Sequence, residues 1–218
     1  MTNSQSVENA DYSQYKIQED TLEDLITSAL KATLNNVLGK KSKSNSGEDH
    51  HYYSQNWVKQ FAIKIEQHYN EEDLVSFFNS RVPNIKSSLD DVKEFLFDIT
   101  VAKINPIDGS KLSYISEPIW QIESEFKMYL KETIRDFQKL ISGNAPYKMM
   151  VGPFNTKDDS SEYREITQAP ASHISEDLYF LFITHPEKWK IHKEILWKLY
   201  KWKGEDWDYL ERGEVNIK

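Results

Sequence analysis

The spacing of the apolar residues changes along this chain from the repeat of a helix to the repeat of a strand. Within residues 22–38 apolar side chains recur every three or four positions, which predicts an amphipathic helix. Within residues 93–101 they alternate with other residues, and Phe95, Phe97, Ile99 and Val101 fall on one face. Such alternation predicts a β-strand with one buried face. We therefore expect an α/β protein in which helices pack on a sheet.

The same patterns predict the other elements. Helices are expected at residues 55–69, 71–79, 129–142 and 186–203, with one more inside the polar residues 155–175. Strands are expected at residues 112–115, 119–126, 147–152 and 178–183, an exposed loop at 40–49, turn residues at 105–109, and an irregular tail after residue 203. The strand–helix–strand succession favours a parallel pair, and the two strands before it can pair antiparallel. The expected fold is a central mixed β-sheet flanked by helices, with a helical N-terminal extension.

Length, charge and cysteine content limit the classes of protein. The 218 residues suit a single domain at residues 16–218, behind a disordered N-terminus at residues 1–15. The absence of cysteine excludes disulfides and thiolate metal sites. A net charge of −8 argues against binding nucleic acid by charge alone, although clustered acids that hold cations are compatible with a nuclease. The most hydrophobic stretch is too short for a membrane span, and we expect a cytoplasmic protein without a membrane partner.

Several carboxylates lie on the predicted strands opposite the apolar face. Asp98 belongs to one strand, and Glu123 and Glu125 belong to the next long strand; Glu94 can add a fourth acid. Because residues two apart on a strand point the same way, paired strands can bring these acids together. Mg²⁺ prefers one or two carboxylates, water and substrate phosphate as ligands. The alternative interpretation is a solvated, acidic face of the sheet.

The stretch from Glu94 to Asp98, followed by Glu123-Ser-Glu125, a helix and the strand at 147–151, resembles the core of the PD-(D/E)xK nuclease superfamily, the restriction-endonuclease-like fold. The resemblance covers about residues 55–152. It implies a core of a helix, a β-hairpin or meander, a crossover helix and a further strand. It also implies that Asp98 and Glu123 bind Mg²⁺ or Mn²⁺, which activates water for phosphodiester hydrolysis. Glu125 stands where the family usually carries lysine, and there it can bind metal or position the water.

Some members of the superfamily carry the missing lysine or a glutamine on the following helix. Lys139 and Gln138 are the candidates here, ahead of Lys131. Of these, we expect Lys139 to be a catalytic residue. Members also often supply an acid from an early helix, for which Glu66 is the candidate. Each of these residues can equally be a plain surface residue of a helix.

Basic residues suggest contacts to nucleic acid in spite of the acidic composition. One group lies on or near the helix at 129–142 and comprises Lys127, Lys131, Arg135 and Lys139. A second group alternates with Trp189, Trp197 and Trp202, and it comprises Lys188, Lys190, Lys193, Lys198, Lys201 and Lys203. The alternative interpretation of the second group is an amphipathic helix with aromatic core residues and solvated lysines.

Three hypotheses of function follow. The first is a metal-dependent nuclease acting on DNA or RNA, in a restriction or other defence system. The second is a non-catalytic protein of the same fold that acts as an interaction or immunity-type module, with a protein partner or as a homodimer. The third is an unrelated α+β binding domain whose acids only face solvent. A zinc site is not expected, because the six histidines are scattered and form no HxxxH or HExxH motif.

Overall fold

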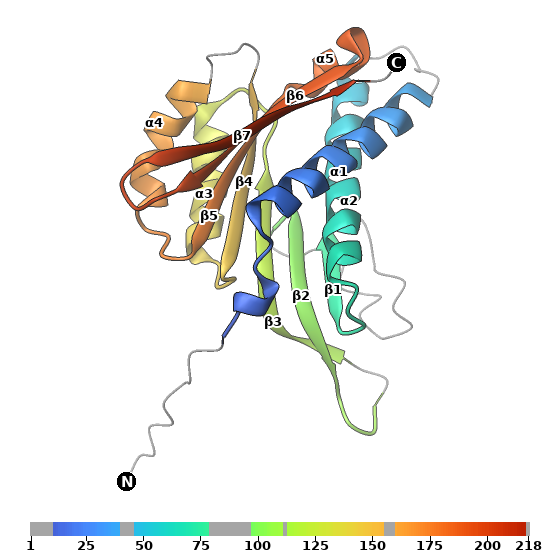
Figure 1. Ribbon diagram of the computed structural model, residues 1–218, viewed down its shortest axis with the longest axis vertical. Coiled ribbons are helices and arrows are strands. Elements are labelled where there is room, and N and C mark those ends of the chain that lie inside the picture. The colour runs from blue at the N-terminus through green and yellow to red at the C-terminus, as the bar shows by residue number, and fades with distance from the viewer. Residues whose placement is uncertain (1–10, 40–45, 79–96, 111–112, 155–159, 217–218) are drawn as a thin grey trace.

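In the described part of the chain, seven strands form one mixed sheet in which the spatial order follows the chain, from β1 to β7. The computed structural model describes residues 11–39, 46–78, 97–110, 113–154 and 160–216 (Figure 1). The strands are β1 (Leu74–Phe78), β2 (Ile99–Pro106), β3 (Ser113–Ser124), β4 (Tyr147–Phe154), β5 (Asp177–Thr184), β6 (Glu194–Trp202) and β7 (Trp207–Asn216). Strands β3, β4 and β5 are parallel neighbours, and the other pairs are antiparallel. The prediction of an antiparallel pair followed by a parallel crossover is confirmed.

Among the described residues, five α-helices cover the two faces of this sheet (Figure 1). They are α1 (Glu19–Gly39), α2 (Ser46–Tyr69), α3 (Leu130–Ser142), α4 (Ser160–Ala171) and α5 (Pro186–His192). Helices α3 and α4 are the crossovers of the parallel strands, and crossovers of one handedness that advance in one direction lie on one face. Helices α1, α2 and α5 cover the opposite face. The chain is thus an α/β protein in which two N-terminal helices precede the sheet.

The core on the α1–α2 face is rich in large aromatic side chains. Trp57 and Phe61 of α2 stack on each other and belong to the same buried cluster as Trp120 and Ile122 of β3. The Trp120 indole N–H also donates to the Tyr69 hydroxyl at 2.8 Å. These contacts confirm that Trp120 and Ile122 point away from Glu123, as the alternation in β3 predicts.

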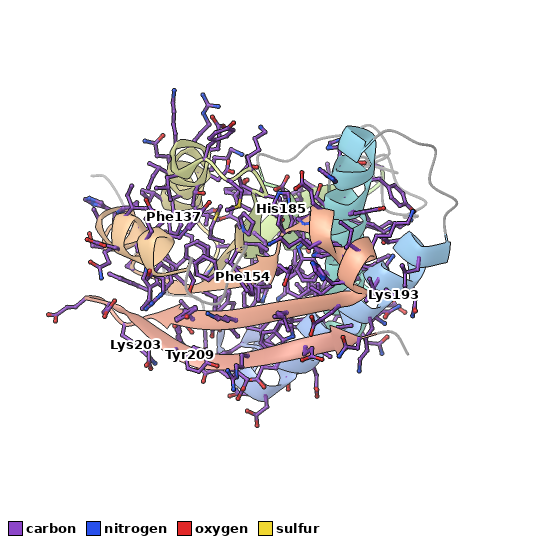
Figure 2. All side chains as sticks on the ribbon, turned by 90° about the horizontal axis from the view of Figure 1, so that it is seen from above. Phe137, Phe154, His185, Lys193, Lys203 and Tyr209 are labelled. Atoms are coloured by element: carbon purple, nitrogen blue, oxygen red, sulfur yellow. The ribbon has the colours of Figure 1, made fainter. Side chains whose placement is uncertain are left out.

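The core on the α3–α4 face is built around the aromatic residues of β5. Phe180 and Phe182 stack with ring centroids 4.0 Å apart, and Phe137 of α3 meets Phe180 edge to face. Figure 2, a view from above, places Phe137 beside α3 and α4. Because α3 buries Phe137 and Leu140 against the sheet, the polar side of the same helix is held at a fixed height over β3.

The prediction of a helix at residues 71–79 is wrong, because Leu74–Phe78 form strand β1. Leu74 and Phe78 face the α2 side, whereas Val75 and Phe77 pack with Ala102 and Ile104 on the other side. All five residues of β1 are buried, Ser76 included, so the strand is a short buried run without regular alternation of apolar and polar residues. Such a run has no period that separates a strand from a short helix.

The strand predicted at 93–101 starts later, since β2 begins at Ile99 and residues 93–96 lie outside the described residues. Phe97 precedes the strand and joins the cluster on the α3 side, so it does not share a face with Ile99 and Val101. The two strands predicted at 112–115 and 119–126 are one strand, β3, which has two register irregularities opposite β2. The turn predicted at 105–109 is confirmed only in part, because Asn105 and Pro106 belong to β2. The turn itself includes Gly109, whose φ of 73° suits glycine.

The C-terminal predictions are wrong in two places. The expected helix at 186–203 ends as α5 at His192, where Lys193 adopts a left-handed φ of 53°, and Glu194 opens strand β6. The tail after residue 203 is not irregular, because Trp207–Asn216 form β7 as the edge strand next to β6. Pairing with β5 and β7 supplies backbone hydrogen bonds to both sides of β6, which outweighs its helix-like sequence.

The N-terminal boundaries also differ from the prediction. Helix α2 begins at Ser46, inside the stretch predicted as a loop. The predicted start at residue 55 lies inside this helix, where the Ser54 hydroxyl donates to the His51 carbonyl at 2.9 Å. Before α1, Ser13–Tyr15 form a short 3-10 helix and Tyr15 is buried, so the ordered part of the chain begins before residue 16. Residues 1–10 lie outside the described residues.

Gly213 offers a test of the β6–β7 packing. A Cβ atom at this position would lie 2.5 Å from the buried Trp197 ring, so Gly213→Ala is expected to destabilise the fold by about 1–3 kcal/mol. Gly39→Ala is the control, because no atom lies within 4 Å of its Cβ position. Urea denaturation measures both variants, and equal stabilities would contradict the tight approach of β7 to Trp197.

Candidate functional site

Glu123 is a buried carboxylate on the second-last position of β3, under helix α3. Its side chain is 1 % exposed, and its neighbours Ile122 and Ser124 pair with β4 in parallel register. The Oε2 atom accepts a hydrogen bond from Lys139 of α3, whereas Oε1 is buried without a hydrogen-bond partner among the described residues. A buried acceptor left unpaired costs about 1–3 kcal/mol, so this position calls for a proton or a cation.

Asp98 lies directly before β2, opposite the end of β3. Its Oδ2 atom accepts the backbone N–H of Ser124 at 2.8 Å, which holds the carboxylate next to the strand that carries Glu123. The β2–β3 register pairs Ile99 with Ile122, so the residues that precede and follow them, Asp98 and Glu123, are opposite each other. The predicted convergence of these two acids is therefore reproduced by the structure.

The two acids perturb each other. Burial and, second to it, the nearby charge of Asp98 raise the pKa of Glu123 to about 8 against the opposing effect of Lys139. Burial also raises the pKa of Asp98, although its hydrogen bond from Ser124 and the charge of Lys139 act in the opposite direction. Pairs of carboxylates that are costly to ionise are typical of functional sites and of metal ligands.

Lys139 is the one candidate on α3 that the fold brings to the acids. Its Nζ atom lies 3.0 Å from Glu123 Oε2 and 2.8 Å from Asp136 Oδ1. Hydrogen bonds to these two carboxylates raise the pKa of Lys139 above its ordinary value, against the effect of burial. Lys139 is thus a firmly charged ammonium group. The alternative candidates Gln138 and Lys131 are exposed.

Glu125 lies beyond the end of β3 and takes a different direction from Glu123. Its carboxylate accepts the backbone N–H of Lys127 at 2.7 Å, and its own N–H donates to the Val151 carbonyl of β4. Burial raises its pKa, and the bond to Lys127 opposes that effect. Among the described residues no three Asp, Glu or His side chains are grouped so as to hold one metal ion. A metal site built from Asp98, Glu123 and Glu125 together stays a prediction.

Two further acids were candidates. Glu66 of α2 accepts the backbone N–H of Ser76 at 3.0 Å, which ties α2 to β1. This contact gives Glu66 a role in joining the two elements. Glu94 lies outside the described residues.

A cavity of about 460 Å³ opens beside Asp98 and Glu125, where β3 and β5 end. In open α/β sheets the carboxyl ends of parallel strands are where ligands commonly bind. The cavity lining comes from α2, the start of β2, the end of β3 and the start of α5; its polar members include His50, His51, Asp98, Glu125, His185 and Glu187. Figure 2 shows His185 near α2.

The histidines of this cavity were not assigned a role from the sequence. His50 Nδ1 lies 3.0 Å from Glu187 Oε1, and the rings of His50 and His185 meet edge to face at 6.0 Å. A histidine paired with an acid would have indicated a functional role, but these two residues are far apart in the chain, so the sequence does not reveal the pair. Only the packing of α5 on α2 brings them together.

The basic residues divide into exposed and structural ones. Lys127 and Arg135 have side chains 65 % and 63 % exposed and pair with Glu125 and Glu132, respectively. Lys201, in contrast, is buried and forms ion pairs with Asp177 and Glu19. The second basic group is thus not one helical face, since its members are divided between α5, β6 and the residues that follow each of them.

The fold and the site define an α/β protein with paired acids next to a cavity at the ends of parallel strands. Comparison with protein-family models, curated proteins and solved structures found no match to this chain. Within the described part of the chain, no helix combines the length and the apolar character that a membrane crossing requires.

Proposed function

We propose that the protein is a metal-dependent nuclease that hydrolyses phosphodiester bonds of DNA or RNA, as part of a restriction or other defence system. The observation that carries the proposal is the buried, incompletely bonded carboxylate of Glu123, opposite Asp98 and bonded to Lys139. A charge-bearing group of this kind is costly to bury, so a role for it in binding a cation accounts for its presence better than a solvated sheet face does.

The order of elements supports a restriction-endonuclease-like core. Helix α2, the antiparallel strands β1, β2 and β3, the crossover helix α3 and the parallel strand β4 follow one another in the order that the resemblance implies. Asp98 precedes the second strand and Glu123 lies on the third. These positions correspond to those of the Asp and of the first acid of the motif.

The residues present fit a hard, oxygen-preferring cation such as Mg²⁺ or Mn²⁺. Glu123 Oε1 is a buried acceptor with an unfilled bonding position, and Asp98 supplies a second carboxylate on the adjacent strand. Mg²⁺ commonly binds through one or two carboxylates and completes its shell with water and substrate phosphate. Two carboxylates are therefore enough to bind the ion, and Glu125 would position the water from the cavity side.

Each side chain then has a defined task. Asp98 and Glu123 would hold the ion, which when bound activates water and offsets charge on the phosphate. Lys139, as a permanent ammonium group next to Glu123, would add positive charge beside the phosphate and limit the repulsion between substrate and carboxylates. Lys127 and Arg135 are exposed on the same side and would contact the phosphate backbone.

Removal of either proposed ligand tests this function. Asp98→Asn and Glu123→Gln are expected to lose the heat of Mn²⁺ binding in calorimetry and to cleave a mixture of DNA and RNA substrates at least about 100-fold more slowly. Asp108→Asn, in the exposed β2–β3 turn, is the matched control and should behave as wild type.

A wild-type protein that binds no Mn²⁺ and cleaves neither nucleic acid would overturn the proposal. In that case the preferred function is the non-catalytic protein of the same fold, an interaction or immunity-type module. The pair of Lys139 with Glu123 is the feature that would then be structural, since an ammonium group can satisfy a buried carboxylate without metal.

A further inference from the structure

The attacking water needs a proton acceptor beside the site, and the lysine that the superfamily usually carries on the strand of Glu123 is absent. Glu125 occupies the position at which the superfamily usually has lysine, and its carboxylate is bonded to Lys127. Lys139 replaces the charge of that lysine, but two carboxylates hold it as an ammonium ion, so it has no lone pair to offer near neutral pH. If the protein hydrolyses phosphodiesters, another side chain at the same cavity must serve as the base.

His50 has the surroundings of an oriented base. Its Nδ1 lies 3.0 Å from the Glu187 carboxylate, a placement that favours a proton on Nδ1 and a lone pair on Nε2 in the neutral ring. Nε2 has no hydrogen-bond partner among the described residues, and the side chain is 29 % exposed. A histidine positioned by a carboxylate through one nitrogen, with the other nitrogen available, is the arrangement that general bases use.

The other two histidines of the cavity are already engaged. His185 Nδ1 accepts the Glu187 backbone N–H as the N-cap of α5, and the His185 ring also bonds to the backbone of Phe126. Burial lowers the pKa of His185, which keeps it neutral as a link between the end of β3 and α5. His51 Nε2 is bonded to the Gln55 amide at 2.9 Å on the exposed side of α2. The arrangement therefore singles out His50.

We propose that His50, oriented by Glu187, is the general base of this site for hydrolysis of a phosphodiester bound in the cavity beside Asp98. This inference rests on the proposed nuclease function. In the step, the water oxygen forms its bond to phosphorus and the bond from phosphorus to the leaving nucleoside oxygen breaks. The water proton moves to Nε2 of His50 and is then released to solvent, which regenerates the imidazole, and the leaving oxygen takes up a proton from solvent.

Charged groups from every element around the cavity act on His50. Glu187 faces it at 3.0 Å, and the other titratable groups of the lining are His51 of α2, Asp98, Glu125, Lys127 and His185. A base must be unprotonated to act, so a rate that depends on a histidine base should fall toward acidic pH. This acidic limb of the pH–rate profile is the signature of the proposal.

The test compares His50→Gln with the matched control His68→Gln, on the same helix about 27 Å further along. With Mn²⁺ present, His50→Gln should lower kcat about 100-fold with little change in KM and should remove the acidic limb. Glu187→Gln should lower kcat less. Calorimetric Mn²⁺ binding should be unchanged in all three variants, which separates a base from a metal ligand. A His50→Gln protein with wild-type kcat and an intact acidic limb overturns the proposal.

Nitrogen-15 NMR of the histidine rings gives a readout that needs no catalysis. Neutral His50 should carry its proton on Nδ1 in wild type and lose this preference in Glu187→Gln; a proton fixed on Nε2 in wild type overturns the proposal. If the wild type binds Mn²⁺ but cleaves nothing, both the proposed nuclease function and the proposed base are wrong. If the wild type cleaves and His50→Gln is fully active, only the proposal that His50 is the base is wrong.

Discussion

Lys139→Met is expected to destabilise the folded protein by about 3 kcal/mol at pH 8. The variant keeps the aliphatic contacts of the side chain but removes the ammonium group that lies 3.0 Å from Glu123 and 2.8 Å from Asp136. Both carboxylates are then left without a cation, and they are only 1 % and 11 % exposed. The Lys139 side chain is itself 36 % exposed, so water moderates the loss and places it at the low end for a broken buried ion pair.

The pH dependence of this loss identifies its cause. The raised pKa of Lys139 means that its contribution is fully present below the ordinary lysine value of 10.5 and is lost only above it. On the acid side the contribution fades when the carboxylates take up protons, so the variant should differ less from wild type at pH 5 than at pH 8. Urea denaturation at both pH values measures the difference, with the exposed Lys131→Met as control. Equal losses for the two variants would contradict a structural role of the Lys139 pairs.

Glu123→Gln is expected to stabilise the metal-free protein at pH 8, by roughly 2 kcal/mol. Glu123 has a pKa of about 8 in the folded protein against an ordinary value of 4.5, so between these values the folded state keeps a proton that the unfolded state has lost. Stability therefore decreases as the pH rises through this window and is greatest below it. The raised pKa values of Asp98 and Glu125 act in the same direction. Glutamine imitates the protonated acid and escapes this loss, apart from a weaker bond to Lys139.

Thermal unfolding with and without metal measures this effect. Without metal the melting temperature of Glu123→Gln should exceed that of wild type by about 5 °C at pH 8 and match it at pH 5. Saturating Mn²⁺ should reverse the order at pH 8, because only wild type gains stability from binding. Glu132→Gln, which alters a partly exposed acid of α3 paired with Arg135, serves as control and should change little. A variant that is less stable than wild type in metal-free buffer at pH 8 would contradict the cost assigned to Glu123.

The sheet around the site was predictable because its strands alternate. Trp120 and Ile122 face one core and Glu123 the other, and the pattern of β3 alone requires this division. The approach of Asp98 to Glu123 also followed, since two adjacent antiparallel strands leave few registers that bury one face. Neither inference needed contacts from distant parts of the chain.

The parts that the sequence did not predict depend on tertiary contacts. β1 is buried on both faces and has no usable period, and β6 is a strand because β5 and β7 pair with it. Lys139 was only one candidate of three until Phe137 and Leu140 fixed the rotation of α3. His50 and Glu187 meet only through the packing of α2 with α5, a contact between distant segments that no local pattern encodes.

The separate origins of the two halves of the site affect how such a protein can change over time. Asp98, Glu123 and Lys139 come from one continuous stretch of chain, whereas the pair of His50 with Glu187 joins an N-terminal helix to a C-terminal one. Substitutions in α5 can thus alter or abolish proton transfer while the carboxylates stay intact. A lineage built on this fold could lose catalysis and retain cation binding in a single step, and the reverse loss would require changes in a different part of the gene.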